Sequence, residues 1–139
     1  MKVIDAKNAV LGRLASMTAK QLLNGEEIAV VNAEKAIVTG NPTSIREKYL
    51  RLRRIGNPHH GPFYPTKPDA IVRRTIRSMM PYKTNKGRIA FKRLRVYVGV
   101  PEQLAKEGKE NIANKLIRSN FITVKEVSKT LGWKESINN

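Results

Sequence analysis

Arginine and lysine side chains in the middle of this sequence have the types and spacing for chemistry with phosphate groups. Residues 46–54 read Arg-Glu-Lys-Tyr-Leu-Arg-Leu-Arg-Arg, with Glu47 as the single acid. Guanidinium groups are planar forks that can grip a phosphate through paired hydrogen bonds. A solvated helix face normally interleaves acids with its bases, and this segment does not. We therefore expect phosphate binding here, with a merely solvated helix face as the alternative.

The excess of bases continues to residue 95. Residues 46–95 contain 15 basic and 2 acidic residues, a balance of +13, whereas the whole chain carries +16. A charge of this size implies a polyanionic partner that binds the middle of the chain. The residues of this region that we expect to contact the partner are Arg46, Arg51, Arg53, Arg54, His59, His60, Arg73, Arg74, Arg77, Lys83, Lys86, Arg88, Lys92 and Arg93.

The two histidines are adjacent and lie close to two aromatic residues. His59 and His60 precede Phe63 and Tyr64 in a stretch rich in proline and glycine. These rings could stack on unpaired bases, and packing within the loop is the alternative. Adjacent side chains diverge, and no Asp or Glu lies within eight residues of the histidines. We therefore predict neither a metal site nor acid–base catalysis at this position.

Gly12-Arg13 resembles a phosphate-binding turn at the start of a helix. The sequence has no glycine-rich motif of the dinucleotide-binding or P-loop type, so we expect no nucleotide cofactor. A nucleic-acid phosphate at this helix N-terminus, with Arg13 beside it, is one interpretation, because free amides and the helix dipole attract anions. Close packing at Gly12 is the other. There is no cysteine, and no carboxylate cluster suggests an enzyme.

The pattern of apolar residues predicts an α/β framework within one domain of 139 residues. Short β-branched runs at residues 2–5 and 27–32 flank a helical pattern at 10–24, and a third short strand is expected at 36–39. A strand–helix–strand unit of this kind builds a parallel sheet. The later elements that we expect are a helix at 43–55, an extended loop at 56–68, a helix at 69–80 capped by Asp69, a helix at 86–93, a strand at 94–99 and a helical tail at 102–139 that includes a short capped helix at 123–133.

The distribution of basic residues favours RNA over DNA. They are spread over a loop and several predicted helices, which suits a structured RNA better than a single groove-reading helix would. A DNA-binding regulator with a helix-turn-helix beginning at residue 124 is one alternative, although only six residues follow Trp133. An RNA-modifying or nucleotide-using enzyme is the second, because fold does not determine function.

Four strings of the sequence, in this order and spacing, resemble one known family. They are GRLAS at 12–16, VNAEKAIVTGN at 31–41, MMPYKTNKG at 79–87 and RLRVYVGVP at 93–101. Together they resemble the L-thirteen family of large-subunit ribosomal proteins, and GPFYP at 61–65 is similar to its archaeal and eukaryotic branch.

The resemblance implies a three-layer α/β/α fold around a small, mostly parallel sheet of about four strands, with basic loop and helix extensions. It also implies a non-enzymatic structural protein of the large subunit, bound to large-subunit ribosomal RNA and to neighbouring ribosomal proteins, with no cofactor and no small-molecule substrate. Residues 113–127 are our expectation for a protein-facing surface. No export signal or membrane-spanning stretch is visible at the N-terminus or beyond, which predicts a cytoplasmic location.

Overall fold

The computed structural model describes residues 1–56, 59, 61, 63–111 and 120–134. The helices and strands, in chain order, are β1 (Lys2–Asp5), α1 (Leu11–Leu23), β2 (Ile28–Val31), β3 (Ile37–Thr39), α2 (Pro42–Arg54), α3 (Pro68–Ser78), α4 (Asn85–Lys92), β4 (Leu94–Val96), β5 (Lys109–Glu110), β6 (Phe121–Thr123) and α5 (Val124–Thr130). Two short 3-10 helices lie at Ala33–Lys35 and Glu102–Leu104. No helix among the described residues is long and apolar enough to cross a membrane.

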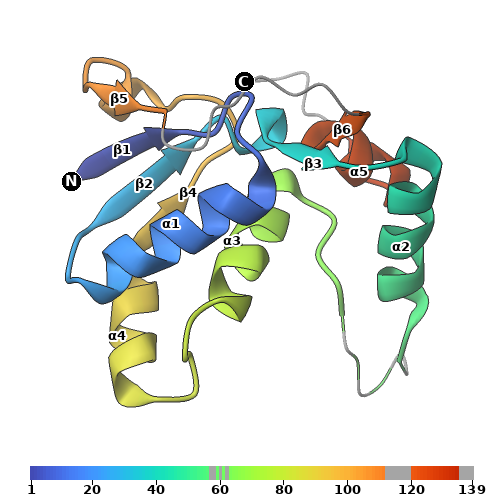
Figure 1. Cartoon of the computed structure of the whole chain (residues 1–139), viewed down its shortest axis with the longest axis horizontal. Coiled ribbons are helices and arrows are strands. Elements are labelled where there is room, and N and C mark those ends of the chain that lie inside the picture. The colour runs from blue at the N-terminus through green and yellow to red at the C-terminus, as the bar shows by residue number, and fades with distance from the viewer. Residues whose placement is uncertain (57–58, 60, 62, 112–119, 135–139) are drawn as a thin grey trace.

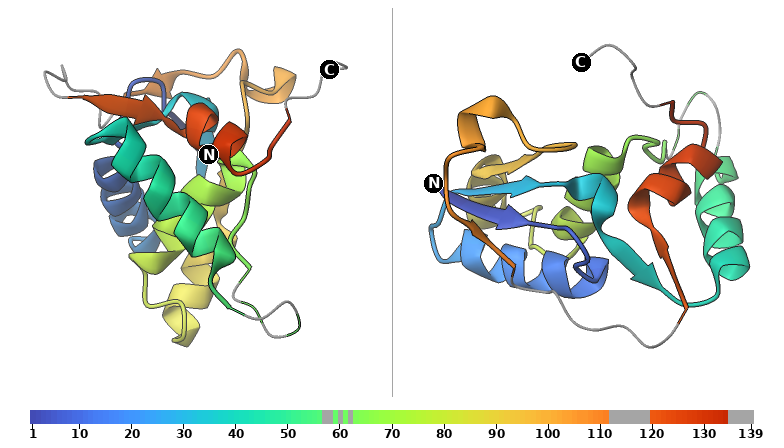
Figure 2. Two further views of the ribbon diagram at one scale, coloured as in Figure 1. Left: turned by 90° about the vertical axis from the view of Figure 1, so that its right-hand side faces the viewer. Right: turned by 90° about the horizontal axis from the view of Figure 1, so that it is seen from above.

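The central sheet has four parallel strands in the order β4-β2-β1-β5 (Figure 1). All four residues of β2 are buried, as expected for a parallel strand covered on both faces. Helices α1, α3 and α4 lie on one face of the sheet (Figure 2). On the other face, Leu104 of the second 3-10 helix packs with Val3, Ala29 and Val31. The predicted three-layer α/β/α arrangement is confirmed, and its second outer layer is short.

Helix α1 begins and ends close to where its pattern predicts. Leu11, Leu14 and Leu22 are buried on one side of the helix, while Arg13 is exposed. Gly25 follows the helix with a φ of 97°, a left-handed conformation that glycine adopts without steric cost. The connection from β1 through α1 to β2 is therefore the strand–helix–strand unit that the sequence predicts.

The start of α3 differs from the prediction. Pro68 occupies the first turn and Lys67 is the N-cap residue, so Asp69 lies inside the first turn instead of capping it. Proline is favoured at this position because its fixed φ suits the helix and its missing N–H has no partner there anyway. Asp69 still places a negative charge near the positive end of the helix dipole. The helix ends at Ser78, before the predicted boundary.

We predicted a helical tail at 102–139 that includes a short capped helix, and only the short capped helix agrees with the described residues. These residues contain the strands β5 and β6, and α5 is the only α-helix among them. Strand β6 pairs antiparallel with β3 in a separate two-stranded sheet, so β3 is not part of the central sheet. The three residues of β6 are too few to display an alternating pattern. Thr123 then caps α5 by accepting a hydrogen bond from the backbone N–H of Glu126 at 3.3 Å.

A continuous hydrophobic core joins the helices to both sheets. Ile71 and Ile76 of α3 are fully buried with Leu14 and Leu22 of α1, and burying one such side chain contributes about 1.5–3 kcal/mol. Tyr49 anchors α2 to the same core. The core thereby fixes the orientations of α2 and α3, the two helices whose other faces carry arginines.

Candidate nucleic-acid interface

Helix α2 presents its cations away from the core. Ile45 and Tyr49 are its buried residues, and the side chain of Asn41 caps it by accepting a hydrogen bond from the N–H of Thr43 at 2.9 Å. The arginines expected to bind phosphate are all exposed, at positions 46, 51, 53 and 54. Three of them lie in the last turn, where cations also complement the negative end of the helix dipole.

Helix α3 separates its apolar and basic residues in the same manner. Ile71, Val72 and Ile76 are buried, whereas Arg74 and Arg77 are exposed. Arg73 is half-buried, and its Nη1 donates a hydrogen bond to the carbonyl of Leu94 at 3.1 Å. Arg73 therefore also ties α3 to the central sheet, a role that the sequence does not reveal.

Each arginine of α3 lies over an aromatic ring. The guanidinium carbon of Arg73 is 4.2 Å from the ring centroid of Phe91, that of Arg74 is 4.9 Å from Tyr64, and that of Arg77 is 4.4 Å from Tyr82. Such contacts contribute about 0.5–1 kcal/mol at exposed sites. A guanidinium stacked on a ring keeps its N–H edges available for a phosphate. The rings therefore orient these cations without neutralising them.

The loop between α2 and α3 is fastened to both helices. Arg53 of α2 donates to the carbonyl of Tyr64 at 3.3 Å, and Arg74 of α3 donates to the carbonyl of Phe63, also at 3.3 Å. The rings of Tyr49 and Tyr64 meet edge-to-face, with centroids 5.8 Å apart. The described part of the loop thus connects Arg53 of α2 with Arg74 of α3. We call the exposed arginines of these two helices the arginine surface: Arg46, Arg51, Arg53, Arg54, Arg74 and Arg77.

The tyrosine environments differ along the arginine surface. Burial raises the pKa of Tyr64 above its ordinary value, the nearby Tyr49 raises it further, and Arg74 opposes both effects. Burial also raises the pKa of Tyr49. Hydrogen bonding to Arg77, followed by the charge of Lys83, lowers the pKa of Tyr82. Tyr64 therefore acts as a packed neutral ring at neutral pH.

The basic residues around α4 form a second exposed group. Thr84 caps the helix, its hydroxyl accepting a hydrogen bond from the N–H of Gly87 at 3.2 Å. Lys83, Lys86, Arg88 and Lys92 are exposed. Arg93 is half-buried instead, and its Nη1 donates to the carbonyl of Leu22 at 3.1 Å, near the end of α1. Arg93 thus contributes to packing between elements.

The remaining predicted site residues have different surroundings. Arg13 is exposed in the first turn of α1, and a Cβ added to Gly12 would meet no atom within 4 Å. Close packing at Gly12, the alternative interpretation, is therefore wrong. His59 is exposed in the loop, and His60 lies outside the described residues. The described part of the chain contains no group of three or more His, Cys, Asp or Glu side chains suited to a metal ion.

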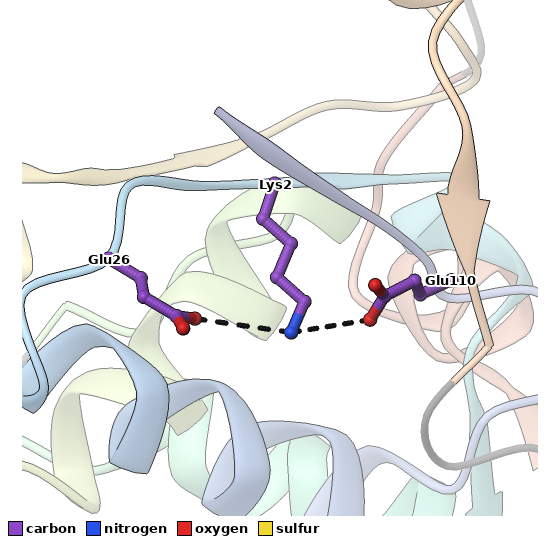
Figure 3. Close-up of polar contacts among 3 residues, drawn as sticks. All are labelled: Lys2, Glu26 and Glu110. Carbon is purple, nitrogen blue, oxygen red and sulfur yellow. Dashed lines mark ion pairs between the residues drawn. The ribbon is translucent and has the colours of Figure 1, made fainter.

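Ion pairs in the described residues lie elsewhere. Lys2 on β1 is 4.0 Å from the carboxylate of Glu26 and 3.3 Å from that of Glu110 (Figure 3). Within the described part of the chain, no arginine between residues 46 and 95 forms an ion pair with a carboxylate. The positive charge of the arginine surface is therefore available to an external anion.

The aromatic partners of the arginines were missed from the sequence. Phe91 lies 18 positions after Arg73 and Tyr82 lies five after Arg77, so no helical spacing signals either pair. Tyr64, the partner of Arg74, was considered from the sequence only as a ring for base stacking or loop packing.

Comparison with known proteins decides the family. The sequence matches the family described as Ribosomal protein L13 over residues 1–103. The chain belongs to the ribosomal protein L13 family. Large ribosomal subunit protein uL13 of Methanocaldococcus jannaschii is 51% identical over 138 residues, covering 96% of this chain and 99% of the relative. The protein of the same name from Methanopyrus kandleri is 49% identical over 138 residues, covering 95% of this chain and 87% of the relative.

A third relative named large ribosomal subunit protein uL13, from Archaeoglobus fulgidus, is 44% identical over 137 residues, covering 95% of this chain and 88% of the relative. The resemblance noted from the four sequence strings is confirmed. The match to the ribosomal protein L13 family includes the arginine surface and α4, while β6 and α5 lie beyond it.

Proposed function

We propose that this chain is a structural, non-enzymatic constituent of the large ribosomal subunit that binds large-subunit ribosomal RNA and supports its assembly and stability. The names of the relatives place those proteins in the large subunit. The observation that supports RNA binding is the arginine surface itself, on which two helices present guanidinium groups that form no ion pair with a described carboxylate.

The contact set follows the exposure of the side chains. The exposed RNA-binding candidates are Arg13, Arg46, Arg51, Arg53, Arg54, His59, Arg74, Arg77, Lys83, Lys86, Arg88 and Lys92. Arg73 and Arg93 hold elements together through backbone carbonyls, so we assign them mainly to positioning. His60 remains a candidate from its place in the sequence alone.

The mechanism is electrostatic and depends on rigidity. Neutralising phosphates releases counterions from the RNA, which supplies sequence-independent affinity. Because α2, α3 and α4 carry cations in separate places, phosphates from different RNA segments can bind one rigid body at the same time. The approach of these RNA segments to one another then becomes favourable, and in this way the chain supports folding of the RNA. Neighbouring ribosomal proteins are the other expected partners.

The two alternative functions have little support. A helix-turn-helix beginning at α5 needs a recognition helix after it, and no helix follows α5 among the described residues. An enzyme would require a reactive constellation, and membership in a ribosomal protein family argues against one.

The decisive experiment is sedimentation of a lysate from the source organism on a sucrose gradient. We expect the chain to migrate with large subunits at moderate salt and to remain there until high salt screens the phosphate contacts. Migration with free proteins or with small subunits at moderate salt would overturn the proposal. A variant with the arginines of this surface changed to glutamine tests the surface directly, because this variant should shift toward the free fractions.

A further inference from the structure

The ring of Phe63 is exposed to solvent, although the neighbouring ring of Tyr64 is packed against other side chains. Its side chain is 68% exposed, whereas the neighbouring Tyr64 is half-buried between Tyr49 and Arg74. Phenylalanine has no polar group that could hydrogen-bond with water, and an exposed ring contributes little to the hydrophobic core. We propose that Phe63 is a base-stacking site for one unpaired nucleotide of the bound RNA. This inference rests on the RNA-binding function proposed above and adds a base contact to it.

The backbone holds the Phe63 ring in place. A Cβ added to Gly61 would lie 3.1 Å from both Cδ2 and Cε2 of the ring, and Gly61 has a φ of 78°. The ring therefore lies against the Gly61 backbone, at a position where a side chain would crowd it. The carbonyl of Phe63 accepts a hydrogen bond from Arg74. A ring supported on one side and exposed elsewhere is preorganised for stacking, since less freedom is lost on binding.

Cationic hollows border the ring. Phe63 lines a hollow of about 470 Å³ with Leu50, Arg53 and Arg54, and it also lines one of about 290 Å³ with arginines of α3. Neither hollow is lined by a described Asp or Glu. A flat apolar ring bordered by guanidinium groups complements a nucleotide, whose base is flat and whose phosphate is anionic.

The chemistry favours an unpaired base over other occupants. Within a duplex, both faces of a base are already stacked, so only a looped-out or terminal base can cover Phe63. One exposed phenylalanine in the described part of the loop accommodates one base, not the row of bases bound by a single-strand platform. An apolar partner protein would not account for arginines beside the ring.

The test compares substitutions at Phe63 in the full chain, using deproteinised large-subunit ribosomal RNA from the source organism as the probe. We expect Phe63→Ala and Phe63→Leu each to weaken binding on the order of tenfold, because base–aromatic stacking has about this effect. Phe63→Trp should bind at least as well as the natural chain. The slope of affinity against salt should stay unchanged in all three, since no charge is removed.

A matched control is Phe121→Ala. Phe121 is 47% exposed on β6, and it lines neither hollow. Its loss should leave RNA affinity unchanged. Thermal unfolding of every variant checks the fold, and we expect midpoints close to that of the natural chain because Phe63 is exposed.

Ultraviolet crosslinking supplies an independent readout of contact. Irradiating the complex and digesting both components should give a nucleotide adduct on the peptide that contains Phe63, and Phe63→Leu should abolish it. If Phe63→Ala or Phe63→Leu binds RNA like the natural chain, the stacking site is refuted even when arginine substitutions still weaken binding. If the arginine substitutions also have no effect, the proposed RNA-binding function fails as well.

Discussion

Replacing both Arg74 and Arg77 with glutamine removes two exposed positive charges from α3 and leaves its buried face intact. Each charge that neutralises a phosphate contributes about 0.7 to 0.9 to the slope of log affinity against log salt concentration. We therefore expect the slope to become shallower by about 1.4 to 1.8. Between about 50 and about 200 mM salt, the affinity ratio of natural chain to variant should shrink roughly 7- to 12-fold.

The same structure bounds the effect on stability. Arg74 and Arg77 each lose a contact with a tyrosine ring, and each contact contributes about 0.5–1 kcal/mol at exposed sites. Arg74 also loses its hydrogen bond to the carbonyl of Phe63, which contributes about 0.5–1.5 kcal/mol. The double variant should therefore unfold roughly 5–15 °C below the natural chain. Affinity is measured by filter binding to deproteinised large-subunit ribosomal RNA over a salt series, and stability by thermal unfolding followed by circular dichroism.

Two further variants separate binding from folding. Lys106→Gln with Lys129→Gln removes two exposed charges outside residues 46–95 and should leave the salt slope unchanged. Arg93→Gln loses the hydrogen bond to Leu22 and should lower the free energy of unfolding by about 1–2 kcal/mol, with a smaller change in slope. The reasoning is refuted if the Arg74 and Arg77 double variant keeps the natural slope, or if its loss of binding simply follows a loss of folded protein.

Two predictions concern stability alone. Gly87→Ala should lower the free energy of unfolding by more than about 2 kcal/mol, because the added Cβ would overlap the carbonyl oxygen of Pro81. Urea denaturation measures this loss, and an unchanged midpoint would contradict the packing of α4 described above. Stability should also fall as pH rises above about 10, because burial raises the pKa of Tyr64 in the folded state; the folded chain then holds a proton that the unfolded chain releases. Tyr64→Phe should make this alkaline decline shallower in unfolding experiments run over a pH series, and an equally steep decline would assign it to other groups.

The elements that the sequence predicted well are those with an apolar pattern that extends over several turns of one continuous segment. Helix α1 has several turns of apolar periodicity and a glycine at its end, so neither its existence nor its boundaries depended on distant contacts. Strand β6 has three residues and exists because β3 lies opposite it, and this pairing joins segments far apart in the chain. The prediction that Asp69 caps α3 was wrong for a local reason. Pro68 and Asp69 are both suited to the start of a helix, and Pro68 lies in the first turn, one residue before Asp69.

The positions of the charged residues could be predicted from the sequence, but the group that each charged side chain contacts could not. Arg73 and Arg74 are neighbours with the same chemistry, yet one donates to the sheet carbonyl of Leu94 and the other to the loop carbonyl of Phe63. Helix geometry points adjacent residues in different directions, and only the packed structure reveals what each direction meets. The charge map of the sequence therefore counts Arg73 and Arg93 with the other cations, although in the structure these two donate to backbone carbonyls.

The aromatic rings beside the α3 arginines suit the RNA-binding function proposed above better than carboxylates would. A long side chain left free loses conformational entropy when it grips a phosphate, so an oriented guanidinium is an advantage. A carboxylate would also orient it, but the phosphate would have to displace that carboxylate and compete with its charge. The rings of Phe91, Tyr64 and Tyr82 lie beside the guanidinium groups and keep the charge intact. A surface built this way can be both ordered and unneutralised, and that combination is what the proposed electrostatic binding of RNA requires.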